Sequence, residues 1–435
     1  MPRKIYGAFL FLSAPDNNYI RLPLTNVFTP ERLLMDTLFE QRLNEIQLCL
    51  QNEDLNRAGQ RLLDLTYDFK FDQPARDAAL ALRKAYNEGK QLGKAKNDNN
   101  GLQAAYQSLL TDISQQRPGA AAPPGKRKTI ASINNISKHY HSVLHNFHFN
   151  PISMELTQGA IIGLVGENGN GKTTLLRMIC GELAADSGTI DYYFDGAVTQ
   201  DWQLIKKKVA FIPQRLERWY GTAYEKISFE AAIKGFKEEA NREKVDFIIH
   251  RMGLTNFREL SWTQLSSGYK LRFEIAMALV WEPEILILDE PLANLDIQAQ
   301  ELLLQDLRNL ANSLRNPVSI ILSSQQLHEV ETVADQIIFL KNGKAVFNGS
   351  LHEFRQMNTA LTFELSGDFG YEQLQRLLAG WEELRIEQSA SAFTISCSTR
   401  HSKEELLQLL LDNHFGVHYF RNISGSTKKL FSDKY

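Results

Sequence analysis

The sequence predicts an α/β protein with a largely parallel sheet, a mainly helical region before it and a small α+β region after it. Short apolar runs alternate with helical stretches between residues 129 and 351, a pattern typical of a parallel sheet with helices on both faces. Helical spacing of apolar residues dominates residues 1–116, and shorter strands and helices alternate in residues 359–435. These patterns define three expected domains in a chain of 435 residues.

The first expected domain, residues 1–116, reads as a small helical bundle. Thr29 is a candidate N-cap, with Pro30 at the first helical position. Packing together the segments with helical spacing would bury their apolar stripes. These segments are residues 29–51, 55–69, 74–88 and 101–114. The first 28 residues are less helical and stay unassigned, although their short apolar run favours a strand over a secretion signal.

The remaining segments follow in order along the chain. Residues 117–128 read as a linker, because their prolines and glycines resist regular structure. In residues 129–351 we expect five buried strands, at AIIGLVG, KVAFIP, EILILDE, VSIILSS and DQIIFL. Residues 359–435 alternate in the order β-α-β-β-α-β, which is that of a ferredoxin-like fold. The central region has no second copy in the sequence.

Composition and charge exclude some classes of protein. The formal net charge is −3, so we expect no global affinity for nucleic acid and no nucleic-acid partner. Three scattered cysteines, Cys49, Cys180 and Cys397, fit a reducing compartment. No apolar stretch reaches the length of a transmembrane helix, so work at a membrane would require a partner that spans it.

A glycine-rich loop, GLVGENGNGKTTLL, follows the first central strand and opens a helix. Gly166, Gly171, Lys172 and Thr173 satisfy the P-loop pattern, and Gly169 adds a third glycine. Glycines allow successive backbone N–H groups to point at phosphate oxygens, and the helix N-terminus adds its positive dipole end. Lys172 is then expected to reach the β- and γ-phosphates, and Thr173 to ligate Mg²⁺. The fold class is therefore that of a P-loop NTPase.

Two adjacent carboxylates, Asp289 and Glu290, follow the apolar run EILIL. Folding explains them poorly, because charges are disfavoured at such a place unless they are paired or bind a metal. We expect Asp289 to hold Mg²⁺ through water and Glu290 to polarise the attacking water. The alternative, a solvated strand end, is weakened by the P-loop in the same chain.

The two motifs and the sequence between them resemble the ATP-binding cassette (ABC) ATPases over residues 129–351. The resemblance identifies GENGNGKTT as Walker A and ILILDE as Walker B. It implies that Walker A binds ATP through Glu167, Asn168, Gly169, Asn170, Gly171, Lys172, Thr173 and Thr174. Gln214 matches the glutamine that reaches Mg²⁺ and contacts the transmembrane partner. Tyr140 lies where the family has an aromatic residue stacked on adenine, and Asp296 ends a D-loop-like ANLD.

The segment LSSGY, residues 265–269, stands where the family has its signature LSGGQ. Ser266 and Gly268 match, whereas Ser267 replaces a glycine and Tyr269 replaces the glutamine. In the family, this segment caps the γ-phosphate bound by the opposite subunit, at a helix N-terminus. The resemblance therefore implies a head-to-tail pair with a second cassette, as a homodimer or a heterodimer.

The segment SSQQLHEVE aligns with SSHLLEEVE of exporter ATPases, so Gln325 occupies the position of the family's switch histidine. A glutamine amide can donate a hydrogen bond, but it cannot carry a proton charge near neutral pH. His328 lies about one helical turn further on and is expected on a helix surface. We expect ATP binding, with hydrolysis through Glu290 and Gln325 slower than in a histidine-containing cassette.

The C-terminal region narrows the resemblance to the ATP-binding subunits of ABC-2-type exporters, and GSTKKLF matches their final segment loosely at Ser426 and Phe431. This implies an ATPase that drives export through ATP-dependent dimerisation. It would lie in the cytoplasm, peripheral to the membrane, and act with separate transmembrane permease subunits.

Two alternatives to this reading stay open. One is a soluble, non-transport ABC ATPase that couples dimerisation to a protein or nucleic-acid partner. The other is a weakly hydrolytic chain paired with a more standard cassette. The helical region carries no second catalytic motif, but its exposed face could dock a further protein.

Overall fold

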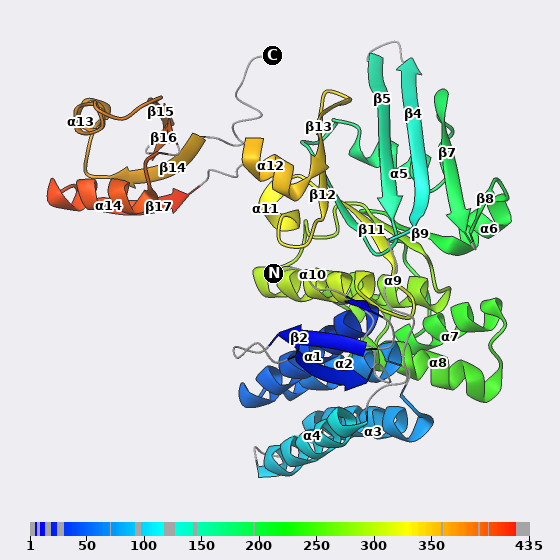
Figure 1. Ribbon diagram of the computed structural model, residues 1–435. Coiled ribbons are helices and arrows are strands. Elements are labelled where there is room, and N and C mark those ends of the chain that lie inside the picture. The colour runs from blue at the N-terminus through cyan, green and yellow to red at the C-terminus, as the bar shows by residue number, and fades with distance from the viewer. Residues whose placement is uncertain are drawn as a thin grey trace. The chain divides into compact units, whose positions relative to one another are not determined.

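The structure is a computed structural model. It describes residues 5–6, 9–13, 19–23, 30–69, 71–91, 97–116, 127–141, 146–194, 196–357, 360–389, 392–398 and 400–422 (Figure 1). The chain divides into two compact units. The first comprises residues 1–127 and 249–256, and the second comprises residues 128–248 and 257–435. No helix in the described ranges is both long and apolar enough to cross a membrane.

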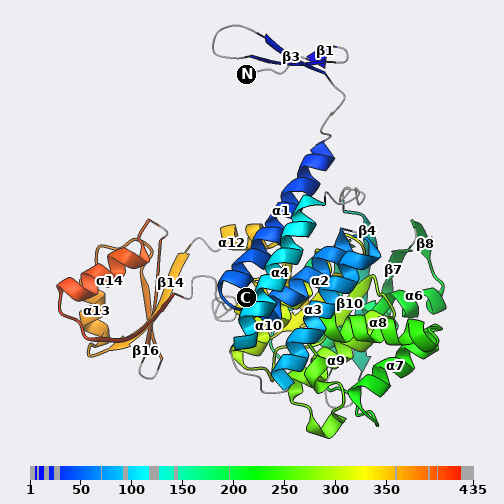
Figure 2. The same ribbon diagram turned by 90° about the horizontal axis from the view of Figure 1, so that it is seen from below.

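The first unit begins with a three-stranded antiparallel sheet, formed by β1 (Ile5–Tyr6), β2 (Phe9–Ser13) and β3 (Tyr19–Pro23). Four helices follow and pack as a bundle (Figure 2). They are α1 (Pro30–Gln51), α2 (Leu55–Asp68), α3 (Gln73–Gln91) and α4 (Asn97–Gln115). These helices match the four segments with helical spacing. The proposed cap at Thr29 lies outside the described residues.

Helix α2 shows why this region is helical and also where its interior departs from a simple apolar core. Asp54 caps α2 by accepting a hydrogen bond from the Arg57 backbone N–H at 3.0 Å. The buried face of α2 includes Leu62 and Leu65, as the periodicity predicts. The same helix also buries Asp64, which lies 3.2 Å from the Arg61 guanidinium. Polar side chains are therefore part of the interior of this unit.

The second unit contains the predicted parallel sheet. Its six strands lie in the order β13-β12-β6-β11-β10-β9, with β13 antiparallel at one edge. The strands are β6 (Ile161–Val165), β9 (Val209–Ile212), β10 (Ile285–Leu288), β11 (Ser319–Ser324), β12 (Gln336–Lys341) and β13 (Lys344–Ser350). The five predicted apolar runs correspond to the parallel strands, and the predicted P-loop-type α/β fold is confirmed.

The helices of this region connect the strands. They are α5 (Lys172–Ile179), α6 (Trp202–Lys208), α7 (Ala223–Lys234), α8 (Glu238–Arg251), α9 (Ser267–Val280), α10 (Ile297–Ala311), α11 (Leu327–Val330) and α12 (Leu351–Met357). Two short 3₁₀ turns, η2 (Thr255–Phe257) and η3 (Trp262–Gln264), separate α8 from α9. His328 is exposed on α11, as expected.

A second, antiparallel sheet was not predicted from the sequence. It has the order β5-β4-β7-β8, with β4 (Thr129–His141), β5 (Asn146–Thr157), β7 (Ser187–Phe194) and β8 (Ala197–Thr199). In β4 the buried Ile133 and Ile136 are three residues apart, because the register shifts between them and Asn135 has φ 51°. This bulge interrupts the two-residue period by which strands are recognised. Buried side chains of this sheet, α5 and the parallel sheet form one core.

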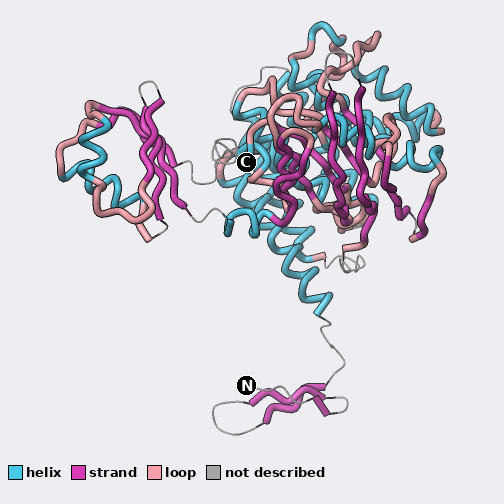
Figure 3. The backbone as a smooth tube through the Cα atoms, turned by 90° about the horizontal axis from the view of Figure 1, so that it is seen from above, coloured by secondary structure: helices cyan, strands magenta, loops and turns pink. Residues whose placement is uncertain are grey.

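The C-terminal region forms the predicted β-α-β-β-α-β arrangement. Its elements are β14 (Ala360–Gly367), α13 (Tyr371–Leu377), β15 (Arg385–Ser389), β16 (Ala392–Ser398), α14 (Lys403–Asp412) and β17 (Val417–Asn422). The sheet has the order β15-β16-β14-β17 and is antiparallel throughout. Both helices lie on one face of this sheet and share its apolar core (Figure 3). The GSTKKLF segment lies outside the described residues.

Candidate functional site

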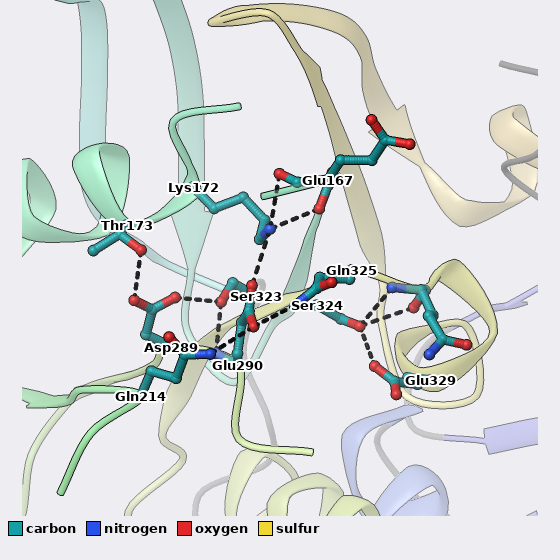
Figure 4. Close-up of polar contacts among 12 residues, drawn as sticks. Glu167, Lys172, Thr173, Gln214, Asp289, Glu290, Ser323, Ser324, Gln325 and Glu329 are labelled. Carbon is teal, nitrogen blue, oxygen red and sulfur yellow. Dashed lines mark hydrogen bonds and ion pairs between the residues drawn. The ribbon is translucent and has the colours of Figure 1, made fainter. Parts of the chain in front are cut away.

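Polar side chains gather at the carboxyl ends of the parallel strands. Strands β6, β11 and β10 are neighbours in the sheet, so the segments that follow them meet at one edge. These segments are the glycine-rich loop after β6, the two acidic residues after β10 and the polar end of β11 (Figure 4). Ligands of open α/β sheets bind at this edge, and the structure places the predicted loop and carboxylates there.

The glycine-rich loop has a backbone that requires glycine at its end. Gly171 has φ 94°, and a Cβ atom there would lie 2.7 Å from the Phe149 ring. Asn170 is buried, and its Oδ1 accepts a hydrogen bond from the Asn342 backbone N–H at 2.8 Å. Glu167, Asn168 and Gly169 are exposed. The loop is therefore held at its base and open at its tip, directly before helix α5.

The Lys172 ammonium lies inside this loop. Nζ donates to the backbone carbonyls of Gly166 at 2.6 Å and Glu167 at 3.2 Å. It also lies 3.1 Å from Glu290 Oε1, and the Lys172 side chain is only 4% exposed. A buried ammonium with these partners is a preformed cation for phosphate oxygens.

Thr173 and Asp289 lie side by side at the start of α5 and the end of β10. Thr173 Oγ1 donates a hydrogen bond to Asp289 Oδ2 at 2.7 Å. Thr174, the next residue, is half-buried. Hydroxyl and carboxylate oxygens are the ligands that Mg²⁺ prefers in proteins, so the residues present fit this ion.

Ser323 links the two acidic residues, and this link was not predicted from the sequence. Ser323 Oγ donates to Asp289 Oδ1 at 2.6 Å and accepts from the Glu290 backbone N–H at 2.7 Å. Its side chain is buried at the end of β11. The polar cluster SSQQ marked this strand end as unusual, but the sequence did not indicate the bridge. Ser323 therefore fixes the relative positions of Asp289 and Glu290.

Three side chains converge on the Glu290 carboxylate (Figure 4). Oε2 accepts hydrogen bonds from Gln325 Nε2 at 2.7 Å and from Gln214 Nε2 at 2.9 Å. Oε1 faces the Lys172 ammonium. Glu290 itself has φ 48°, a left-handed backbone conformation that is uncommon outside glycine. The structure thus brings together Lys172, Gln214 and Gln325 around one carboxylate that is 7% exposed.

Tyr140 lies on β4. A second aromatic ring, that of Phe147, lies between Tyr140 and the glycine-rich loop. Tyr140 is 39% exposed, and its ring centroid is 6.3 Å from that of Phe147. A Cβ atom at Gly171 would lie 3.0 Å from Phe147 Cζ. Phe147 was not predicted as a site residue, because it lies on β5, a strand that the sequence did not predict. The two rings form an apolar platform beside the loop.

The signature-like segment and Asp296 both stand at helix N-termini. Ser266 caps α9, with its Oγ accepting from the Tyr269 backbone N–H at 3.4 Å. Gly268 lies in the first turn of α9. Asp296 caps α10 by accepting from the Ala299 backbone N–H at 2.8 Å.

A cavity of about 200 Å³ is lined by Gln214, Asp289, Glu290 and Ser267 among others. The start of α9 therefore borders the acidic pair.

A larger groove, of about 670 Å³, adjoins this cavity through Ile212, which lines both. Burial raises the pKa of Glu274 in this groove to about 7. The lining also carries charges of both signs, namely Glu217, Glu230, Lys206, Lys207, Arg218 and Lys226. The same lining includes the apolar side chains Phe211, Trp219, Met277 and Trp281, so the groove combines charged and apolar surface.

Comparisons with known proteins agree with this geometry. Residues 149–293 match the ABC transporter family model. The uncharacterized ABC transporter ATP-binding protein YxlF of Bacillus subtilis is 29% identical over 268 residues, which are 61% of this chain and 83% of that protein. The zinc uptake system ATP-binding protein ZurA of Listeria monocytogenes is 30% identical over 240 residues, which are 52% of this chain and 88% of that protein.

Among solved structures, cbiO1 from Clostridium perfringens, part of the ABC transporter complex cbiONQ, is 25% identical with a TM-score of 0.47. The match covers 54% of this chain and 95% of that one. The sequence relatives and the family model show that the chain belongs to the ABC family of ATP-binding proteins. It is an ABC-type ATPase.

Proposed function

We propose that this chain is the ATP-hydrolysing subunit of an ABC exporter. The names of the relatives support work in transport, although ZurA belongs to an uptake system. Export is supported by the C-terminal β-α-β-β-α-β region and by the segment SSQQLHEVE, which resemble the ABC-2-type exporter ATPases. The observation that carries hydrolysis is the convergence of Lys172, Gln214 and Gln325 on Glu290.

ATP would bind across the glycine-rich loop. Its phosphates lie along the backbone of residues 167–171, at the N-terminus of α5, with Lys172 supplying positive charge. Thr174 follows in the first turn, and Tyr140 stacks on the adenine. Thr173, Asp289 and Gln214 would hold Mg²⁺, which neutralises charge on the phosphates. The 2.7 Å contact between Thr173 and Asp289 supports this pair of ligands.

Glu290 is the general base for the attacking water. Its Oε1 lies 3.1 Å from Lys172 Nζ. With Lys172 bound to the phosphates, the hydrogen bonds from Gln214 and Gln325 would orient the Glu290 carboxylate without removing its charge. Ser323 holds the backbone N–H of Glu290 and one oxygen of Asp289, and so keeps the base and the metal ligand at a fixed spacing.

The chain would act as a head-to-tail pair with a second cassette, either a copy of itself or a related chain. Ser266 and Gly268 would then face the γ-phosphate bound by the partner, and Asp296 would lie at the same interface. ATP joins the two cassettes and hydrolysis releases them, so the closed and open states differ mainly by contacts to the γ-phosphate.

Separate permease subunits would place the chain in the cytoplasm, peripheral to the membrane. We assign their docking surface to the groove around Glu274, because it adjoins the Gln214 segment. In a pull-down of the tagged chain from detergent-solubilised membranes, we expect co-purification of chains with transmembrane helices, identified by mass spectrometry. Recovery of a soluble complex instead, with no such chains, would favour a non-transport role and contradict the proposal.

Introducing a histidine at the switch position should raise turnover. Gln325→His places a group that can carry a proton within reach of Glu290, whereas the present amide only donates a hydrogen bond. We expect a severalfold higher kcat for ATP hydrolysis with little change in KM. Gln325→Ala serves as the matched control and should lower kcat. An unchanged or lower kcat in well-folded Gln325→His protein would mean that Gln325 is either already adapted to this site or irrelevant to turnover.

A further inference from the structure

We infer that the N-terminal helical bundle braces the signature segment, through the turn that follows α8. This inference rests on the proposed head-to-tail pair, because a signature segment acts on the nucleotide of the partner. It assigns a role to the region that the ABC family model, matching residues 149–293, does not cover.

The turn after α8 belongs structurally to the bundle. Residues 249–256 comprise the last three residues of α8 and the turn after it, and they form one compact unit with residues 1–127. Arg251 Nε lies 2.6 Å from Asp64 Oδ1 on α2. Burial alone would lower the pKa of Arg251, but Asp64 and Asp68 raise it above its ordinary value. Carboxylates of the bundle therefore stabilise the charged form of Arg251.

Asn87 on α3 makes the most specific contact with this turn. Its Nδ2 donates to Thr255 Oγ1 at 3.1 Å and lies 3.5 Å from His250 Nδ1. Thr255 Oγ1 and His250 Nδ1 are themselves 2.9 Å apart. Asn87 and His250 are both buried. Gly253 has φ 66°, and a Cβ atom there would lie 2.3 Å from Gln60 Nε2.

The same turn precedes the signature segment along the chain and contacts it through an aromatic ring. Thr255 is the first residue of η2, and Phe257 is its last. The Phe257 ring stacks on that of Tyr269, with centroids 3.7 Å apart and planes inclined by 30°. Tyr269 ends LSSGY, and its backbone N–H donates to Ser266 Oγ. Two peptide bonds therefore separate a side chain bonded to Asn87 from one that packs on the signature.

This chain of contacts explains the unusual residue in the signature. Tyr269 stands where the family has glutamine, and here its ring is used for packing within the chain. A segment that must meet a partner's phosphate is more effective when it is ordered beforehand, since less freedom is lost on closure. The bundle would supply that order, with Asn87 and Thr255 as positioning residues.

The test compares Asn87→Ala with Gln103→Ala. Gln103 Nε2 donates to the Leu50 carbonyl at 2.9 Å, so its removal costs the bundle one hydrogen bond away from the turn. Hydrogen exchange of the nucleotide-free protein is measured by mass spectrometry. We expect severalfold faster exchange in residues 257–269 of Asn87→Ala, with residues 166–174 unchanged and Gln103→Ala like wild type. Equal exchange in residues 257–269 of all three proteins would overturn the inference.

A second pair guards against general unfolding of Asn87→Ala. Thr255→Val removes the hydroxyl at nearly constant shape, and Thr255→Ser keeps it. Only Thr255→Val should show faster hydrogen exchange in residues 257–269. Faster exchange in both variants, or in neither, would contradict the inference that the bundle orders the signature segment.

The consequence for pairing is measured in a Glu290→Gln background. Adding Asn87→Ala should lower the ATP-dependent dimer fraction severalfold, while the affinity of the monomer for a fluorescent ATP analogue stays constant. An undiminished dimer fraction overturns the inference. If Glu290→Gln alone forms no dimer, the proposed function fails instead. The hydrogen-exchange data would still test whether the bundle orders residues 257–269.

Discussion

Lys172→Ala is expected to abolish ATP binding at micromolar nucleotide. The ammonium is buried within the P-loop and already bonded to two of its carbonyls. Alanine would remove the charge that the phosphates meet there. Hydrogen bonds to charged groups contribute about 1.5–3 kcal/mol each, so losing contacts to two phosphates should weaken binding by roughly two to four orders of magnitude.

Equilibrium titration with a fluorescent ATP analogue measures this loss directly. Lys207→Ala is a suitable control, because Lys207 is exposed on α6. The alanine variant also takes a cation away from Glu290, so thermal unfolding should be recorded to confirm that the protein is folded. Unchanged nucleotide affinity in folded Lys172→Ala protein would refute the assignment of the P-loop.

Glu290→Gln is expected to stop hydrolysis while ATP remains bound, and so to enrich a closed dimer. Glutamine keeps an oxygen that can accept from Gln214 and Gln325, but it cannot take a proton from water. General-base catalysis typically contributes about 10²–10⁴-fold to rate, so turnover should fall by at least about 100-fold. The loss of negative charge also leaves Lys172 free to serve the phosphates, which favours the bound state.

Size-exclusion chromatography with ATP and with ADP separates the outcomes for Glu290→Gln. A dimer peak should appear with ATP and not with ADP. Glu329→Gln is the matched control, since Glu329 is a neighbouring carboxylate that accepts a hydrogen bond from Ser324 Oγ. Its turnover and dimer fraction should stay near those of wild type. Absence of the ATP-dependent dimer would contradict either the role of Glu290 or the head-to-tail pair.

The parts of this structure that sequence could predict are those set by local patterns. The P-loop, the acidic pair and the parallel strands lie in continuous stretches whose spacing defines them. The hydrogen bond from Ser323 to Asp289 could not be predicted. The two residues are 34 positions apart, and only the pairing of β10 with β11 brings them together. The bulge at Asn135 hid β4, since it shifts the buried face by one residue.

The interior of the helical bundle was also beyond prediction, for a different reason. Helical spacing indicates which face is buried, but it treats charged residues as exposed. Asp64 is buried with two partners, namely Arg61 three residues earlier and Arg251 187 residues later. Buried charges are tolerated only when paired, and the pairing with Arg251 joins two segments that no local pattern connects.

Residues 249–256, the end of α8 and the turn after it, also determine where the chain can be divided. A protease cut in the segment 117–128, which is rich in proline and glycine, would look harmless from the sequence. The cut would separate the bundle from residues 249–256, which belong to the same compact unit. Asp64 and Asn87 would then lie on one fragment, and their partners Arg251 and Thr255 on the other. Each fragment would then carry buried polar groups with no covalent tie to their partners. We therefore expect the nicked halves to stay associated and neither half to fold independently with native stability.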